Sequence, residues 1–195
     1  GLFEVQDEGS QMLCSLVNAK PGDEVLDFCA GAGGKTLQLA AMLEGRGVVH
    51  ACDPDRTRLE RLKHRAIRAN ATTIRLHDDK PSASLLVDWV LVDAPCSELG
   101  TLRRSPDRRF RISPDEIHRF PSLQLEILEQ AQFHVRPGGH LVYGTCTFNR
   151  SENENVAESF EKLHPEFMRV GNPLRTYPQI HGTDAFFGVL WRRTQ

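Results

Sequence analysis

Short apolar runs alternate with amphipathic segments along most of this chain, and this alternation restricts the fold more than any other feature. Between the apolar runs, hydrophobic residues recur three or four positions apart, which is typical of helices with one buried face. Such strand–helix–strand alternation predicts an α/β fold, with a mostly parallel sheet covered by helices on both faces. The expected buried strands are Glu24–Phe28, Val48–Cys52, Ile74–His77, Trp89–Asp93 and Leu141–Thr145.

Local signals indicate where some of the helices begin. Ser113 is followed by Pro114 and then, at the third position, by Glu116, which is typical of a capped helix start. Ser151 and Glu154 have the same spacing and predict a second capping box. The Pro-Gly sequence at 135–139 predicts a turn before the last of the expected strands. The expected apolar helix faces are Leu59, Leu62, Ala66 and Ala69; Leu125, Leu128, Ala131 and Val135; and Val156, Phe160 and Leu163.

Length and composition indicate a single intracellular domain. The 195 residues, 39% of them hydrophobic, can bury one core, so we expect one catalytic domain over 1–195 with a lead-in segment at 1–20. Because the chain opens at Gly1, it is expected to be the C-terminal part of a longer protein. The five cysteines lack zinc-ligand spacing, and no apolar run could span a bilayer. We therefore expect a cytoplasmic protein, a monomer, with no metal and no membrane partner.

A glycine-rich turn follows the first expected strand and resembles a nucleotide-binding site. A phosphate-binding P-loop would need Gly at Cys29, and the dinucleotide pattern would need Gly at Thr36, so both are incomplete by one residue. Asp53, twenty residues after Gly33, is placed either to bind ribose hydroxyls or to cap a helix beginning near Asp55. Asp78 could similarly bind the amine of an adenine or cap a helix. A ligand that carries adenosine but no pyrophosphate fits best, and S-adenosylmethionine is such a ligand.

Two cysteines follow the next two expected strands, at positions expected to share one edge of the sheet. Cys96 stands in Asp93-Ala94-Pro95-Cys96-Ser97, and Cys146 stands in Gly144-Thr145-Cys146-Thr147. A single cysteine there would usually be a small buried hydrophobe, whereas two indicate chemistry. Positive charge lowers the pKa of a thiol and so favours the nucleophilic thiolate. An arginine-rich loop follows Cys96 and is either a solvated surface or a binding site for an anionic substrate; its arginines are Arg103, Arg104, Arg108, Arg109 and Arg111.

These motifs resemble those of the Sun/Fmu family of ribosomal RNA cytosine-5 methyltransferases over nearly the whole chain. The two cysteine motifs, in this order, carry the resemblance, with Gly100–Asp107 following the first of them. The lead-in Gly1–Gln11 and the segment Leu26–Thr36 are also similar to the family, as is His181–Phe187 near the end. Departures from the family pattern are Ala32, Glu98 and the pair Arg109-Phe110.

The resemblance implies a Rossmann-like class I methyltransferase with a seven-stranded sheet whose last strand is antiparallel. It implies that Cys146 is the nucleophile, that Cys96 assists product release and that Asp93 contacts the reacting base. The arginine-rich loop would then hold RNA phosphates. The residues expected to bind S-adenosylmethionine are Cys29, Ala30, Gly31, Ala32, Gly33, Gly34, Lys35, Asp53, Asp78 and Asp93.

The expected reaction is methyl transfer from S-adenosylmethionine to carbon 5 of a cytosine in RNA, with ribosomal RNA as the expected substrate. Carbon 5 becomes nucleophilic only after a thiolate adds to carbon 6, and reaching carbon 6 requires an unstacked base. Two alternatives remain open: a DNA cytosine methyltransferase with Cys96 as nucleophile, and an RNA-binding assembly factor that does not turn over. A small-molecule methyltransferase would need neither the cysteines nor the arginines. The sequence does not identify the target cytosine.

Overall fold

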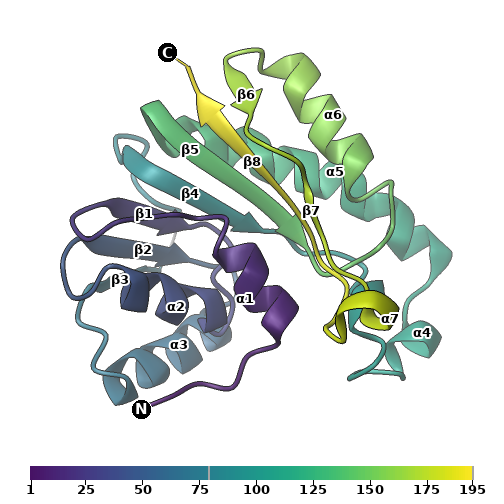
Figure 1. Cartoon of the computed structure of the whole chain (residues 1–195), viewed down its shortest axis with the longest axis horizontal. Coiled ribbons are helices and arrows are strands. Elements are labelled where there is room, and N and C mark those ends of the chain that lie inside the picture. Colours follow the sequence, from purple (N-terminus) through teal and green to yellow (C-terminus); the bar gives the residue numbers. More distant parts are fainter. Residues whose placement is uncertain (79, 195) are drawn as a thin grey trace.

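The computed structural model describes residues 1–78 and 80–194, and its centre is a twisted sheet (Figure 1). Five parallel strands form most of the sheet, in the order β3-β2-β1-β4-β5. They are β1 (Glu24–Asp27), β2 (Val48–Cys52), β3 (Ile74–His77), β4 (Val87–Asp93) and β5 (Val135–Thr145). All five strands predicted from the sequence are therefore present, with boundaries that differ mainly in β5.

The sheet continues beyond β5 with antiparallel pairing. Strand β8 (Phe187–Arg193) runs antiparallel to β5, and β6 (Phe167–Arg169) and the two-residue β7 (Leu174–Arg175) both pair with β8. The path β3-β2-β1-β4-β5-β8-β6 contains the seven expected strands, and β7 is an eighth. The antiparallel last strand expected from the sequence is confirmed.

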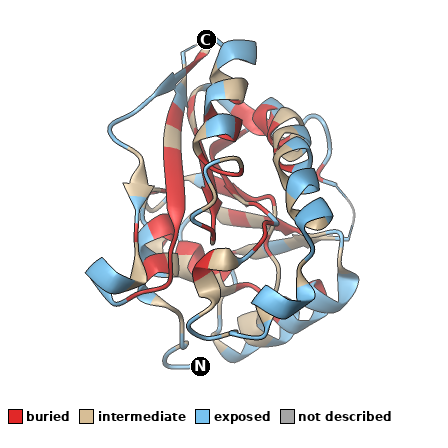
Figure 2. Cartoon of the chain, turned by 90° about the vertical axis from the view of Figure 1, so that its right-hand side faces the viewer, coloured by how far each residue is buried: buried red, intermediate tan, exposed pale blue. Residues whose placement is uncertain are grey.

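Helices cover both faces of the sheet (Figure 1). On one face lie α1 (Glu8–Cys14), α2 (Gly34–Met42) and α3 (Arg56–Arg68), and on the other lie α5 (Pro114–Ala131) and α6 (Glu154–Leu163). Buried residues follow the strands and the inner helix faces, whereas the outer helix faces are exposed (Figure 2). The short elements are α4 (Arg108–Arg111), α7 (Pro178–His181) and the 3₁₀ turns Leu99–Thr101 and Gln132–His134. No described helix is long and apolar enough to cross a bilayer.

Two local predictions are wrong. The turn predicted at 135–139 is instead the first part of β5, where Arg136–Gly139 bulge opposite Asp88 because Val87 pairs with Val135 and Trp89 with His140. The capping box predicted at Ser151 is also absent, since α6 begins at Glu154 with Asn153 as its N-cap residue. The Ser151 hydroxyl and backbone N–H instead donate to the Asn149 side chain. At α5, by contrast, Ser113 accepts the Glu116 N–H as predicted.

The chain order places a crevice between β1 and β4. Strand β1 is followed along the chain by β2 on one side, whereas β4 and β5 lie on its other side. At such a reversal point the loops leaving neighbouring strands separate, and ligands of open α/β sheets bind there. The loops after β1, β4 and β5 all leave from this edge.

Leu13 of α1 anchors the lead-in segment to the sheet. Gly144 of β5 and Gly188 of β8 are paired across the strands, and a Cβ on either would lie within 2.6 Å of a Leu13 methyl carbon. The two glycines thus leave the space that the fully buried Leu13 side chain fills.

We expect Leu13→Ala to lower the free energy of unfolding by about 2–5 kcal/mol, since glycine neighbours cannot refill the cavity. Urea denaturation measures this loss. Met12, which is 37% exposed on the same helix, provides the control, and Met12→Ala should cost less than about 1 kcal/mol. Equal losses for the two variants would show that α1 is only loosely attached.

Candidate active site

A cleft of about 790 Å³ opens at the carboxyl ends of β1, β2, β4 and β5. It contains most of the residues that the sequence predicted for cofactor binding and catalysis. Gly33 does not line it, and neither do the five arginines of the loop after Cys96. The predicted residues that line the cleft are Cys29, Ala30, Gly31, Ala32, Gly34, Lys35, Asp53, Asp78, Asp93, Cys96 and Cys146.

In the glycine-rich turn after β1, one glycine packs closely against a neighbouring helix and two others leave their backbone accessible from the cleft. Gly33 has a φ of 90°, and a Cβ there would lie 2.1 Å from a methyl carbon of Leu62 in α3. Gly33 therefore lets α2 and α3 approach each other, as a left-handed glycine can. At Gly31 and Gly34 an added Cβ would meet nothing within 4 Å, so the backbone there is accessible to a ligand.

Asp53 belongs to the cleft and is not a helix cap. Its carboxylate accepts hydrogen bonds from the backbone N–H of Gly31 and of Asp55, each at 2.9 Å. The N-cap of α3 is Asp55, whose side chain accepts from Thr57 and Arg58. The capping alternative for Asp53 is therefore wrong. Asp78 lies exposed at the rim of the cleft.

Lys35 and Asp93 form an ion pair in the cleft, which the sequence did not predict. The Lys35 Nζ donates to Asp93 Oδ2 at 2.7 Å, and the side chains are 10% and 28% exposed. Burial opposes a charge on Lys35, but the Asp93 carboxylate outweighs it and raises the pKa of the ammonium group. A fixed positive charge thus lies beside the carboxylate expected to contact the base.

The two cysteines meet in the same cleft. The distance between the sulfur atoms of Cys96 and Cys146 is 3.3 Å, and both thiols are free. Cys96 is buried, whereas Cys146 is partly exposed. The hydrogen bond with Cys96 raises the pKa of the Cys146 thiol well above its usual value, and burial and the Asp93 carboxylate act in the same direction. The sequence suggested that the arginine-rich loop would lower this pKa, but the hydrogen bond with Cys96, burial and Asp93 outweigh any such effect.

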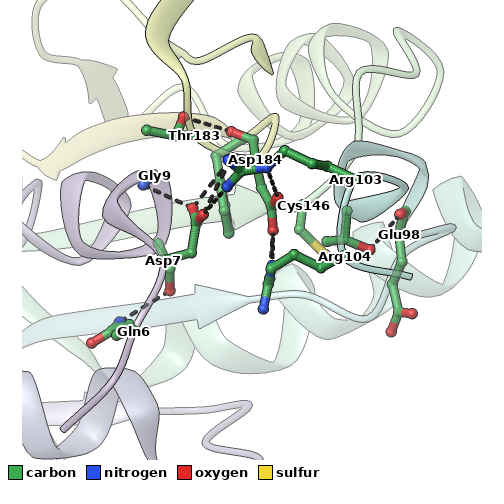
Figure 3. A network of polar contacts seen from close by, with 12 residues as sticks. Gln6, Asp7, Gly9, Glu98, Arg103, Arg104, Cys146, Thr183 and Asp184 are labelled. Atoms are coloured by element: carbon green, nitrogen blue, oxygen red, sulfur yellow. Dashed lines mark hydrogen bonds and ion pairs between the residues drawn. The ribbon is translucent and has the colours of Figure 1, made fainter. Parts of the chain in front are cut away.

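Buried carboxylates hold the first two arginines of that loop (Figure 3). Arg104 forms an ion pair with the fully buried Asp184, which also attracts Arg103. Arg103 donates to Asp7 at 3.2 Å and to the Gly182 carbonyl at 2.8 Å. Asp7 in turn caps α1 and accepts the backbone N–H of Asp184. Three distant chain segments therefore meet beside Cys146.

The other arginines point to different partners. Arg108 donates to the carbonyl of Ser97 at 3.2 Å, Arg111 pairs with Asp107 at 3.0 Å, and Arg109 lies over the Phe110 ring. Arg103, Arg104, Arg109 and Arg111 nevertheless remain exposed. Among the described residues, no cluster of His, Cys, Asp and Glu could hold a metal ion.

Sequence reasoning assigned no role to two fully buried acids near the cysteines, Glu152 and Asp184. Each lies among polar residues close to a strand. The only sequence signal for their burial is the apolar strand nearby. Gln6 and Ser10 of the lead-in segment also line the cleft and were not predicted as site residues.

Comparison with known proteins identifies the family to which this site belongs. The family model for the 16S rRNA methyltransferase RsmB/F matches residues 14–191. The chain belongs to this family. The Sun/Fmu resemblance inferred from the sequence is thereby confirmed, and so is the class I Rossmann-like methyltransferase fold.

Curated relatives of this RsmB/F domain extend well beyond it. The probable ribosomal RNA small subunit methyltransferase B of Bacillus subtilis (strain 168) is 33% identical over 99% of this chain and 48% of its own length. The ribosomal RNA small subunit methyltransferase F of Escherichia coli O9:H4 (strain HS) is 32% identical over 100% of this chain and 46% of its own. The chain thus spans about half the length of these relatives.

Solved structures superpose closely on the RsmB/F domain. The crystal structure of PH0851 has a TM-score of 0.91 and 33% identity, and covers 96% of this chain and 46% of that one. NSun6 from Pyrococcus horikoshii with SFG has a TM-score of 0.87 and 27% identity, and covers 100% of this chain and 54% of that one.

We expect Cys96→Ala to move the pH profile of Cys146 alkylation to lower pH, because the hydrogen bond that most raises the Cys146 pKa is lost. Rates of iodoacetamide labelling between about pH 7 and pH 10, followed by peptide mapping, measure this shift. Cys52→Ala is the control, since the Cys52 thiol donates to the Phe28 carbonyl instead. A Cys96→Ala profile that coincides with wild type would mean that the two sulfurs are not in contact in solution.

Proposed function

We propose that this protein transfers a methyl group from S-adenosylmethionine to carbon 5 of a cytosine in RNA, through a covalent bond between Cys146 and carbon 6. The observation that carries the proposal is the contact of Cys96 with Cys146 in a cleft that also contains the glycine-rich turn. Both curated relatives are named as ribosomal RNA small subunit methyltransferases, which supports ribosomal RNA as the substrate and the cytoplasm as the place of action.

The cleft fits S-adenosylmethionine. The accessible backbone at Gly31 and Gly34 can approach the ligand closely, and Asp53 follows β2 as a ribose-binding acid would. Asp78 at the rim is available for the adenine amine. The similar NSun6 was solved with SFG, an analogue of S-adenosylmethionine. When bound, S-adenosylmethionine supplies an electrophilic methyl group.

The residues of the cleft account for the remaining chemistry. The Cys146 thiol gives its proton to the Asp93 carboxylate as the sulfur adds to carbon 6, and Asp93 passes this proton to ring N3. The ring becomes an enamine with a nucleophilic carbon 5. Asp93 shares a proton at ring N3 and so stabilises the adduct, and the neighbouring Lys35 holds the Asp93 carboxylate in place. After carbon 5 has taken up the methyl group, Cys96 removes the remaining proton of carbon 5; it does so as a thiolate, having released its own proton to solvent. The N3 proton returns to the Asp93 carboxylate. The carbon 5–carbon 6 double bond then re-forms as the Cys146 sulfur leaves.

The raised pKa of Cys146 means that the free protein holds this residue as a thiol. The proton must therefore leave when the substrate is bound. Burying a cytosine against the two sulfurs would displace the hydrogen bond between them, and the nearby charges of Lys35 and Arg104 favour the thiolate that results.

The exposed arginines of the loop after Cys96 are proposed to contact RNA phosphates. Arg103 and Arg104 are fixed by Asp7 and Asp184 and keep about half of their side-chain surface, 49% and 55%, open to solvent. Arg109 and Arg111 extend the same positively charged loop. An unstacked cytosine could then enter the cleft while its flanking phosphates stay on this surface.

The DNA-type alternative would use Cys96 as nucleophile, and the structure offers an argument against it. Cys96 is only 4% exposed, whereas Cys146 is more accessible from the cleft. A base that enters the cleft therefore meets the Cys146 sulfur more readily.

We expect Asp53→Ala to weaken S-adenosylmethionine binding by about tenfold or more, as the loss of hydrogen bonds to a charged acceptor would. Isothermal titration calorimetry measures the affinity. Asp55→Ala is the matched control, because Asp55 caps α3 and does not line the cleft, and its affinity should stay within about twofold of wild type. An unchanged affinity for Asp53→Ala would remove Asp53 from the cofactor site.

Serine variants of the two cysteines should lose different steps of the reaction. Cys146→Ser should lose both the covalent RNA adduct and methyl transfer, because a serine hydroxyl is hardly ionised at neutral pH. Cys96→Ser should still form the adduct and accumulate it, since release is impaired. Denaturing gels with small-subunit ribosomal RNA that contains 5-fluorocytidine, which cannot lose a proton from carbon 5, detect the adduct in wild type.

The reverse pattern, with the adduct lost only in Cys96→Ser, would favour the DNA-type mechanism. Absence of the adduct in wild type would favour the non-catalytic RNA-binding alternative.

A further inference from the structure

Glu152 is a fully buried carboxylate in the loop between β5 and α6, and it accepts four hydrogen bonds from described residues. Its Oε2 accepts from the Ser97 N–H at 2.8 Å and from Gln124 Nε2 at 3.2 Å. Its Oε1 accepts from the Ser97 hydroxyl at 2.6 Å and from Asn149 Nδ2 at 2.9 Å. Two donors at each oxygen satisfy an ionised carboxylate completely.

Three of these four donors come from the loops that carry Cys96 and Cys146, and the fourth, Gln124, comes from α5. Ser97 follows Cys96 directly, and Asn149 lies three residues after Cys146. Thr147, the residue next to Cys146, also joins the cluster, with 2.9 Å between its hydroxyl oxygen and that of Ser97.

The direction of these bonds can be assigned. Because Ser97 has one hydroxyl proton and gives it to Glu152, Thr147 must donate to Ser97. Thr147 in turn accepts the Asn149 N–H at 3.2 Å. This chain of hydrogen bonds, from Asn149 through Thr147 and Ser97, ends at the Glu152 carboxylate, which must act as an acceptor.

Neighbouring bonds fix the residues before each cysteine as well. Gln124 also donates to the Pro95 carbonyl at 3.0 Å, just before Cys96. Asn153 accepts from Thr145 at 2.5 Å and donates to the Thr147 carbonyl at 2.9 Å, on the two sides of Cys146. Glu152 thus joins the two loops at the end of the sheet, and its neighbour Asn153 fixes the Cys146 loop alone.

We propose that Glu152 is a positioning residue that holds the Cys96 and Cys146 loops so that the two sulfurs reach the same cytosine. Burying a carboxylate is costly, and a well-packed apolar residue would serve stability as well or better. The catalytic part of this role rests on the proposed function, in which Cys146 adds to the ring and Cys96 takes a proton from it. A displacement of about 1 Å between such groups can cost about a hundredfold in rate.

The test needs neither RNA nor cofactor in its first step. Diamide oxidises two adjacent thiols to a disulfide: the S–S bond forms, and both hydrogens and two electrons pass to the diamide N=N bond, which becomes a hydrazine. Wild type should form a Cys96–Cys146 disulfide readily, because the sulfurs are 3.3 Å apart. Peptide mapping after alkylation identifies this pair among the five cysteines.

Glu152→Gln should slow this disulfide by about tenfold or more, because the amide brings two N–H donors to a site where every neighbour donates. In the second step, methyl transfer to ribosomal RNA should show a kcat lowered about tenfold or more, with the KM for S-adenosylmethionine within about twofold of wild type. The control is Glu158→Gln, on the exposed face of α6, which should match wild type in both assays.

Thermal unfolding separates positioning from a purely stabilising role. A residue that only stabilised would lower the Tm and leave the disulfide rate of the folded protein unchanged, and that result would overturn the proposal. If Glu152→Gln does not fold, Thr147→Val decides: it keeps the side-chain shape and removes the link to Ser97, so it should slow the disulfide in the same direction. A wild-type disulfide rate in Thr147→Val would then refute the role.

Failure of the proposed function has a different signature. A wild type that does not methylate RNA but cross-links rapidly, with Glu152→Gln slow, would refute the function and retain Glu152 as the residue that holds the cysteine loops.

Discussion

The parallel pairing of β4 with β5 is the constraint on which the site depends. Asp93 lies opposite Gly144 in this register, so both strands end at the same edge of the sheet. The loops that follow therefore leave side by side, and the Ala94 N–H bonds the Gly144 carbonyl to extend the ladder past β4. Cys96 and Cys146, fifty residues apart in sequence, meet only because of this register. A shift of one residue would turn the side chains of one strand to the opposite face.

Ion pairs and hydrogen bonds compensate the charges buried around the cysteines. Lys35 is paired with Asp93, Arg104 with Asp184, and Glu152 with four uncharged donors. An uncompensated buried charge would be costly, so these contacts determine which loop conformations are possible. The loop from Cys96 to Arg104 is fixed at its start by Glu152 and at its end by Asp184. Gly100, in its middle, donates to the Cys146 carbonyl and leaves no room for a Cβ.

The same arrangement keeps Cys146 protonated. The Cys96 and Cys146 sulfurs share a hydrogen bond, which keeps a proton between them. The neighbouring carboxylates also disfavour a thiolate at Cys146. Lys35 and Arg104 supply positive charge, yet each is already neutralised by its own acid. The protonation state of Cys146 thus depends on its hydrogen bond with Cys96 and on the charges around it.

The five parallel strands and the glycine-rich turn follow from the sequence, and so does the expectation that Cys96 and Cys146 share one edge of the sheet. Local hydrophobic periodicity and the topology of parallel sheets are sufficient for these conclusions, because strand ends in such sheets share an edge. The assignment of Asp93 and Lys35 to the same site came from the family resemblance. The bulge at Arg136–Gly139 was misread as a turn, since proline and glycine permit both and only the pairing with β4 selects between them. The tertiary structure alone decided that Asp53 holds the Gly31 N–H, that Asp184 holds Arg103 and Arg104, and that Glu152 joins the two cysteine loops. Such partners lie tens of residues apart, and a carboxylate in a polar segment looks the same in sequence whether it faces water or four buried donors.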